Sequence, residues 1–224
     1  MSSTFFPERI DPEVWGCQYD TVKKTFFYDL WIVGKNNKYG VYNSTIDTIL
    51  VPIEYDSING SEYPDLWLVG KNNLFGAYNS ATDIWPVPME YDDIFNVGVD
   101  LWYVWKQKKM GIYNSSTVAL VLPMEHDYIQ CISPTQFLVK KNGKHGFFDV
   151  ATSTWSLPLE YDMTLPGCNF WFVKKEGKFG IYNISTGALE VETEYDEISP
   201  TRNYDNRFFA IKDGIRGTLV LGMS

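Results

Sequence analysis

Pairs of carboxylates recur in this sequence at a spacing that could support chemistry. Glutamate and aspartate stand two residues apart in five places: Glu54 and Asp56, Glu90 and Asp92, Glu125 and Asp127, Glu160 and Asp162, Glu194 and Asp196. Residues two apart on a β-strand share a face, so each pair could bind Ca²⁺ or act as general acid and base. A pair of side chains that occurs in every unit of a repeat is more simply explained by a structural role in each unit. We therefore expect no metal site, and we expect the pairs to cap turns or contact the recurrent lysines Lys35, Lys71, Lys106, Lys141 and Lys175.

Other groups that could catalyse or bind a ligand are few. The only two histidines, His126 and His145, stand where other repeats have aromatic residues, which favours a packing role. The three cysteines, Cys17, Cys131 and Cys168, are odd in number and form no CxxC motif, which argues against disulfides and zinc sites. No nucleophile elbow, phosphate-binding loop or HExxH motif occurs. Catalysis needs dissimilar groups that converge on one point, so we predict that the protein is not an enzyme and needs no cofactor.

The carboxylate pairs belong to a repeat of about 35 residues. A marker glycine occurs at positions 40, 76, 111, 146, 180 and 217, in steps of 36, 35, 35, 34 and 37. The tripeptide EYD or a variant of it starts at 18, 54, 90, 125, 160 and 194, with nearly the same steps. Two markers in phase predict a repeat architecture.

Each repeat contains three short segments typical of strands. The first is apolar, as in LWIV at 30, and ends at a two-residue turn rich in Asn and Gly, which tolerate the positive φ of primed hairpin turns. The second contains the marker glycine, which we expect to mark a bulge, a positive φ or a close approach. Asn or Asp three residues later predicts a further turn. The third, as in VPIEYDSI at 51, alternates and contains proline in four repeats, which predicts an edge strand.

Composition and the two chain ends complete the predicted fold. Aromatic residues make up 17% of the chain, beside 17 glycines and 11 prolines, which favours an all-β fold. Segment 17–22 has no preceding hairpin, and the hairpin 208–222 has no following third strand. Paired together, they would complete a sixth unit beside five whole ones near 30–58, 66–94, 101–129, 136–164 and 170–198. We therefore predict a single domain over 1–224, a propeller-like closed ring of six three-stranded blades, with an open β-repeat array as the alternative.

The charge of the chain limits its partners. The formal charge is −9, which argues against nucleic acid and favours a basic protein, because affinity for phosphate backbones depends on Lys and Arg. The first residues, MSSTFFPERIDPEV, lack the basic and apolar regions of a signal peptide. No uncharged apolar run approaches the roughly 18 residues of a membrane span. We expect a cytoplasmic protein with no membrane partner.

The repeat pattern resembles that of a known family. An aromatic strand, a Lys-Asn turn, KYGVYN and then VPIEYDSI together resemble the WG-repeat family of bacterial proteins over nearly the whole chain. The chain departs from the family's pattern because no repeat has Trp before the marker glycine. The resemblance implies a repeat architecture that mediates interactions and provides no catalytic residues. Some similar repeat proteins are immunity proteins that protect bacteria from delivered toxins.

The connections between repeats are where the copies differ, and we expect binding residues there. Several connections combine carboxylates with an aromatic residue: Glu62, Tyr63 and Asp65; Asp93, Phe95 and Asp100; Glu197, Tyr204 and Asp205. A ring surrounded by carboxylates suits docking on a basic protein, whereas the alternative is a polar loop whose ring packs inward.

Three tryptophans, Trp85, Trp105 and Trp155, also depart from the repeat. An exposed Trp could be a protein-binding anchor or a platform for a sugar ring, and packing between unequal blades is the other interpretation.

We predict a non-enzymatic immunity protein that neutralises a bacterial toxin, for example a basic nuclease, by occluding its active site. It would act as a monomer in a heterodimeric complex. The predicted partner-binding residues are Glu62, Tyr63, Asp65, Asp93, Phe95, Asp100, Trp105, Tyr204 and Asp205. The alternative is a propeller that binds glycans or peptides through its tryptophans.

Overall fold

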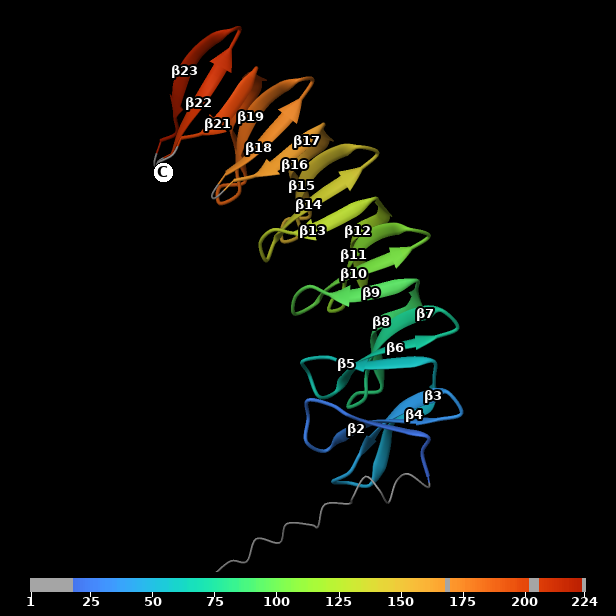
Figure 1. The fold of residues 1–224 in the computed structure, drawn as a ribbon. Coiled ribbons are helices and arrows are strands. Elements are labelled where there is room, and N and C mark those ends of the chain that lie inside the picture. The colour runs from blue at the N-terminus through green and yellow to red at the C-terminus, as the bar shows by residue number, and fades with distance from the viewer. Residues whose placement is uncertain (1–17, 168–169, 202–205, 223–224) are drawn as a thin grey trace, which may run out of the picture. The chain divides into compact units, whose positions relative to one another are not determined.

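The computed structural model describes residues 18–167, 170–201 and 206–222. These residues form 23 strands and no helix, and the strands form six antiparallel sheets (Figure 1). Within each sheet, strands that follow one another in the chain are neighbours. The predicted all-β fold and the sixfold repeat are therefore confirmed.

The strands fall into four classes by their order in the sheet. The first strand has four residues: β1 (Thr21–Lys24), β5 (Ser57–Gly60), β9 (Asp93–Asn96), β13 (Tyr128–Cys131), β17 (Met163–Pro166) and β21 (Glu197–Pro200). The second has six: β2 (Leu30–Lys35), β6 (Leu66–Lys71), β10 (Leu101–Lys106), β14 (Gln136–Lys141), β18 (Phe170–Lys175) and β22 (Arg207–Lys212). The third has six: β3 (Lys38–Asn43), β7 (Leu74–Asn79), β11 (Lys109–Asn114), β15 (Lys144–Asp149), β19 (Lys178–Asn183) and β23 (Ile215–Val220). The fourth has eight and is absent from the last sheet: β4 (Thr48–Tyr55), β8 (Ile84–Tyr91), β12 (Ala119–His126), β16 (Thr154–Tyr161) and β20 (Ala188–Tyr195).

The predicted three-stranded blade is wrong, because five of the sheets have four strands. The chain bends at Asp56 after β4, and the backbone N–H of Asp56 donates to the carbonyl of Gly70 in the next sheet at 2.8 Å. The following residues continue this pairing as β5, with Ile58 opposite Val69. The end of one sequence repeat therefore supplies the first strand of the next sheet.

The predicted closure of a ring by the chain ends is also wrong in its strand pairing. β1 pairs with β2, with Val22 opposite Val33, and not with the hairpin 208–222. The last sheet contains only β21, β22 and β23, and no sheet of the described residues closes on itself. The physical reason is the same change of pairing: the N–H of Asp20 donates to the carbonyl of Gly34 at 2.8 Å, and the chain continues from there as β1 beside β2.

The chain divides into two compact units. The first contains the described residues up to 96 together with 104–107 and 113–119, and the second contains 97–103, 108–112 and the described residues from 120 onward.

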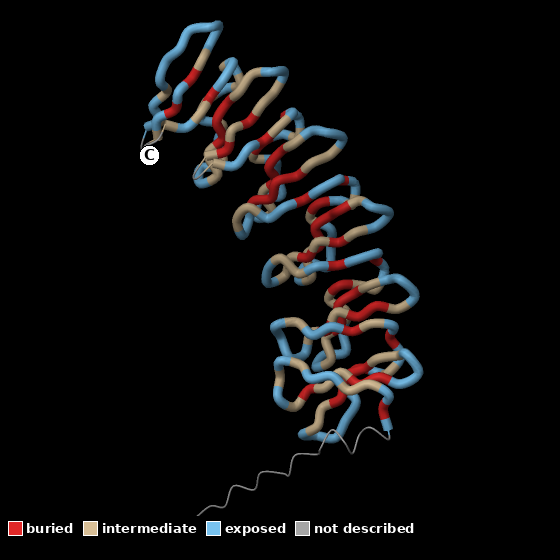
Figure 2. The backbone as a smooth tube through the Cα atoms, in the orientation of Figure 1, coloured by how far each residue is buried: buried red, intermediate tan, exposed pale blue. Residues whose placement is uncertain are grey.

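Each unit has its own apolar core between sheets, and in each sheet the buried residues lie mainly on the strands and the exposed residues on the turns (Figure 2). In the first unit, Tyr55, Trp67 and Tyr78 belong to one buried cluster. In the second, Phe147 stacks on Tyr182 with ring centroids 4.7 Å apart.

The turn between the second and third strands has the predicted primed geometry. Asn36 and Asn37 both have positive φ, 52° and 58°, and the equivalent residue pairs of the other five hairpins do so too. The further turn is fixed by the predicted Asx side chain, because Asn43 Oδ1 accepts the backbone N–H of Thr45 at 2.8 Å.

The marker glycine is required by a close backbone approach. A Cβ on Gly40 would lie 2.4 Å from the carbonyl oxygen of Val51 in β4, where the register shifts through a bulge. Pro52 follows Val51 on this edge strand, so the predicted edge position of the proline segment is confirmed. Gly217 in the last sheet, which has no fourth strand, meets nothing within 4 Å.

Candidate functional site

The recurrent aspartate fastens each sheet to the next. One carboxylate oxygen of Asp56 accepts the backbone N–H of Asn72, in the turn of the next sheet, at 2.7 Å. The other pairs with the ammonium group of Lys38, which follows the turn of the preceding sheet. The lysine and then the backbone N–H hold the pKa of Asp56 below its usual range. We call this arrangement the aspartate clasp, and it recurs at Asp127 with Lys109 and Asn142, at Asp162 with Lys144 and Glu176, and at Asp196 with Lys178 and Gly214.

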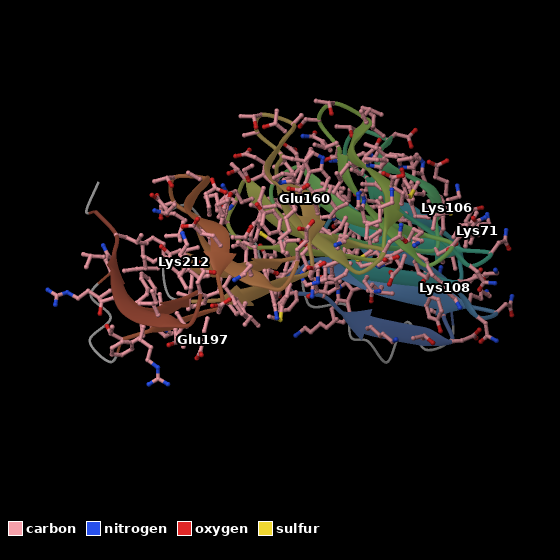
Figure 3. All side chains as sticks on the ribbon, turned by 90° about the horizontal axis from the view of Figure 1, so that it is seen from above. Lys71, Lys106, Lys108, Glu160, Glu197 and Lys212 are labelled. Atoms are coloured by element: carbon pink, nitrogen blue, oxygen red, sulfur yellow. The ribbon has the colours of Figure 1, made fainter. Side chains whose placement is uncertain are left out.

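In four of the five pairs, the glutamate contacts a lysine of the next sheet. The distances from the ammonium nitrogen to a carboxylate oxygen are 3.2 Å for Glu54 and Lys71, 2.8 Å for Glu125 and Lys141, 2.7 Å for Glu160 and Lys175, and 2.7 Å for Glu194 and Lys212. The predicted use of Lys71, Lys141 and Lys175 is therefore confirmed. In Figure 3, Lys71 and Lys106 lie on the same side of the first unit, as equivalent residues of successive sheets.

All five aspartates of the pairs and four of the glutamates thus make contacts between neighbouring sheets. In the described parts of the chain, no group of three or more His, Cys, Asp and Glu side chains could hold a metal ion.

The histidines have the predicted packing role. His126 is buried at the position of the repeat tyrosine, with Nδ1 3.0 Å from the carbonyl oxygen of Pro123, and burial lowers its pKa. His145 contacts Thr164 Oγ1 through Nδ1 at 2.9 Å, and burial lowers its pKa as well.

One clasp lacks its lysine. Asp92 accepts the backbone N–H of Gln107 at 2.6 Å, as the other aspartates do. At the position equivalent to Lys38, however, β7 begins with Leu74. Asp92 therefore makes the backbone contact of the clasp but not its lysine contact. This junction differs from the others in charge but not in backbone path.

The other end of each sheet carries the connections that differ between repeats. In the first two sheets these are the loops 25–29 and 61–65, which precede the second strand, and the turns 44–47 and 80–83, which follow the third. Loop and turn are joined in each sheet, since Ser44 N–H donates to the carbonyl of Asp29 and Ser80 N–H to that of Asp65, both at 2.8 Å. We call these four segments the first-unit loop end, and the two loops lie on the same side of the unit (Figure 1).

Exposed rings are concentrated at the first-unit loop end. The relative exposure is 97% for Phe26, 72% for Tyr28 and 50% for Tyr63, and Ile46 in the adjoining turn is also exposed. Single apolar side chains are common on protein surfaces, whereas a group of them on one surface is typical of an interaction site.

The four segments that carry these rings also contain carboxylates, and they contain no lysine or arginine. Glu62 and Asp65 are exposed in the loop of Tyr63. Asp47 and Asp83 accept the hydroxyls of Tyr42 and Tyr78, the latter at 2.8 Å. Burial, followed by the aspartate contact, raises the pKa of both tyrosines to about 12. The surface is therefore apolar at its rings and negatively charged between them.

Hydroxyl side chains hold the two loops in shape. In the loop 61–65, Ser61 Oγ accepts the backbone N–H of Tyr63 at 3.0 Å and donates to its carbonyl at 3.1 Å. In the loop 25–29, Thr25 Oγ1 accepts the N–H of Phe27 at 3.1 Å and donates to the carbonyl of Leu30 at 2.8 Å. Loops fixed in this way present their rings with little further loss of entropy on binding.

The structure brings together some of the predicted partner-binding residues and separates others. Glu62, Tyr63 and Asp65 share one exposed loop. Asp93 and Phe95 lie on β9, where Phe95 is 60% exposed. The remaining residues are in other places: Asp100 is in a connection of the second unit, Trp105 is partly buried in β10, and Tyr204 and Asp205 lie outside the described residues.

Phe26, Tyr28 and Ile46 were missed by sequence reasoning. The signal was present, because TFFYD at 25–29 stands 36 residues before SEYPD at 61–65, which is one step of the repeat. Assignment of segment 17–22 to the other end of the chain hid this equivalence.

The tryptophans do not form an exposed platform in the first unit. Trp85 is partly buried, with its ring 5.1 Å from that of Tyr78 and 6.3 Å from that of Tyr55. Trp155 in the second unit is 37% exposed and packs edge-on against Phe148 at 5.3 Å. The packing interpretation is therefore correct for Trp85.

No protein-family model and no curated protein matches the sequence. Among solved structures, Kluyveromyces lactis Hsv2 is similar with a TM-score of 0.37 and 9% identity, over 83% of this chain and 68% of that one. A eukaryotic initiation factor is similar with a TM-score of 0.43 and 10% identity, over 85% and 60%. The AfRom2 CNH domain is similar with a TM-score of 0.35 and 10% identity, over 90% and 78%. Function must therefore be inferred from the residues of this chain.

Proposed function

We propose that the chain is a non-enzymatic binding protein that docks on a basic protein through its first-unit loop end. In the form that the WG-repeat resemblance favours, it is a cytoplasmic immunity protein of a bacterium, a monomer that forms a heterodimer with a toxin and covers its active site. A basic nuclease is the example we favour, because a cleft that binds phosphates is positively charged.

One observation carries this proposal: Phe26, Tyr28 and Tyr63 are exposed on one end of one unit, and every charged side chain in the four segments that form it is a carboxylate. The rings supply apolar area for burial, and the carboxylates raise the rate of encounter with a positive surface. A mechanism by occlusion needs nothing more, since covering a cleft requires shape and charge and no reacting group.

The decisive experiment combines binding and protection. The protein is purified with the toxin encoded beside its gene, the dissociation constant is measured, and a toxin-sensitive host is tested for survival with both proteins expressed. We expect a 1:1 complex and survival. Absence of a complex together with absence of protection would refute the proposal.

Variants locate the surface. Phe26→Ala combined with Tyr63→Ala should weaken the complex roughly 100-fold or more, because truncated anchor residues typically cost about 2 kcal/mol or more each. Phe209→Ala is the matched control, since Phe209 is 57% exposed in the second unit. Equal loss in the control would place the interface elsewhere.

A further inference from the structure

The second unit contains a pocket that the proposed function does not use. It lies at the loop end of the fourth and fifth sheets and has a volume of about 480 Å³, within the range of roughly 300–1,000 Å³ common for small-molecule sites. Three segments build it: the start of β14 with its preceding loop, the turn into β16, and the turn 184–187 between β19 and β20.

Hydroxyl groups dominate the wall of this pocket. The lining residues that carry them are Ser133, Thr135, Thr152, Thr154, Ser156, Ser185 and Thr186. The only charged side chain of the lining is Asp149, and Ile184 is its only aliphatic hydrocarbon side chain. This lining disfavours an anion, because no cation is present to offset desolvation, and disfavours an apolar molecule, because most of the wall is polar.

A buried amide lines the same pocket. Gln136 is only 7% exposed, and its Oε1 has no hydrogen-bond partner among the described protein atoms. If the amide group were rotated by 180°, its nitrogen would take the position of Oε1, and an N–H would lack a partner there instead. A buried amide group without a partner is costly. Gln136 Oε1 is closed to solvent in this structure, so a ligand reaches it only when the side chain turns toward the pocket, and the ligand then gains affinity by supplying the missing partner.

The amide is held in the wall of the pocket by its neighbours. Tyr182, whose hydroxyl lies beside the same glycine of the turn as the amide, donates that hydroxyl to Ser156 Oγ at 2.8 Å. Gly187, at φ +68°, lies against the amide, and a Cβ there would come 3.4 Å from Gln136 Nε2. The turn thus passes close enough to keep the amide within the wall.

We propose that this pocket binds a neutral polyhydroxylated ligand, a monosaccharide or a short oligosaccharide. A hydroxyl both donates and accepts a hydrogen bond, so a sugar satisfies Gln136 in either amide orientation and pairs with the hydroxyls of the wall. The site lies entirely in the second unit and is independent of the docking surface of the first.

The test uses the full chain and a panel of neutral sugars: glucose, galactose, mannose, N-acetylglucosamine, maltose and trehalose. Saturation-transfer NMR detects binding, and titration gives the dissociation constant. We expect at least one sugar to bind with a dissociation constant of 10 mM or lower, and inorganic phosphate and acetate not to bind. The proposal is overturned if none of the sugars reaches that affinity or if an anion binds more tightly than the sugars.

Two variants assign the binding to this pocket. Gln136→Leu should weaken it roughly tenfold or more, because it removes the buried amide that the ligand satisfies. Thr152→Val with Thr154→Val removes two exposed hydroxyls and keeps side-chain shape, so it tests the pocket even where the first variant fails to fold. Gln130→Leu, an exposed glutamine on β13 outside the lining, is the control. Unchanged affinity in the threonine variant, or equal loss in the control, would refute the assignment.

Discussion

The carboxylate of Asp56 accepts the backbone N–H of Asn72 at 2.7 Å, across the boundary between two sheets. Because the same aspartate also pairs with Lys38 in the preceding sheet, one side chain fixes the position of two hairpin turns. The EYD motif of the sequence is therefore a fastening between repeats, and its aspartate connects neighbouring sheets.

The aspartate clasp makes stability depend on acid. Its lysine and backbone partners hold the pKa of Asp56, Asp127, Asp162 and Asp196 below the ordinary 3.8. A lowered folded-state pKa means that the unfolded chain binds more protons in this range, so the stabilisation is complete above the ordinary pKa and is lost as the pH falls through the folded value.

We therefore expect the midpoint of thermal unfolding to fall steadily between about pH 5 and pH 2. Replacement of Asp127 and Asp162 by Asn should lower the midpoint at pH 7 and flatten its pH dependence. Calorimetry at pH 7, 5, 4 and 3 measures both effects. An acid slope identical to that of the unaltered protein would show that the clasps do not contribute.

Leu74→Lys should complete the clasp at Asp92, which lacks a lysine at the junction between the second and third sheets. Lys38 and Lys109 each reach the aspartate 18 residues later, and position 74 stands in the same relation to Asp92. We expect a small rise in the thermal midpoint, since an ion pair between exposed groups contributes little.

A double-mutant cycle separates this ion pair from other effects of the substitution. Leu74→Met is the uncharged control, and Asp92→Asn combined with Leu74→Lys should abolish the gain. A gain that persists without Asp92 would have another origin.

The marker glycines should differ in their tolerance of a methyl group. Gly40→Ala places a Cβ 2.4 Å from a backbone carbonyl and should destabilise the protein by roughly 1–3 kcal/mol, as overpacking in a core does. Gly217→Ala meets open space and should change the free energy of unfolding by no more than about 0.5 kcal/mol. Urea denaturation of the two variants makes the comparison, and equal costs would contradict the account of the bulge.

The strands and turns of this protein could be predicted because their signals are local. The paired asparagines at 36 and 37 tolerate the positive φ that a primed turn requires, and Pro52 indicates an edge strand, whatever the rest of the chain does. The assignment of strands to sheets could not be predicted in the same way. VPIEYDSI alternates from Val51 to Tyr55, and the next apolar residue is Ile58, in the opposite phase. The hydrogen bonds change sheet at this point, at Asp56, but the break in periodicity does not reveal which neighbour the strand joins.

The sites show the same limit. Tyr63 with Glu62 and Asp65 could be selected from sequence because the three residues are adjacent in one loop. The pocket at Gln136 could not, because its hydroxyls come from segments as far apart as Ser133 and Thr186, and only the fold brings them together.

The charges and the rings of the first-unit loop end should affect different steps of complex formation. Glu62→Lys should slow association with a basic partner several-fold and weaken its dependence on salt, because exposed carboxylates act mainly on the rate of encounter. Tyr63→Ala should instead speed dissociation, because it removes buried contact area. Surface plasmon resonance at 50 and 300 mM salt separates the two rates.

Glu197→Lys makes the same charge change on an exposed residue of the second unit and should leave both rates nearly unchanged (Figure 3). If Glu197→Lys slowed association as much as Glu62→Lys, net charge rather than this surface would steer the partner.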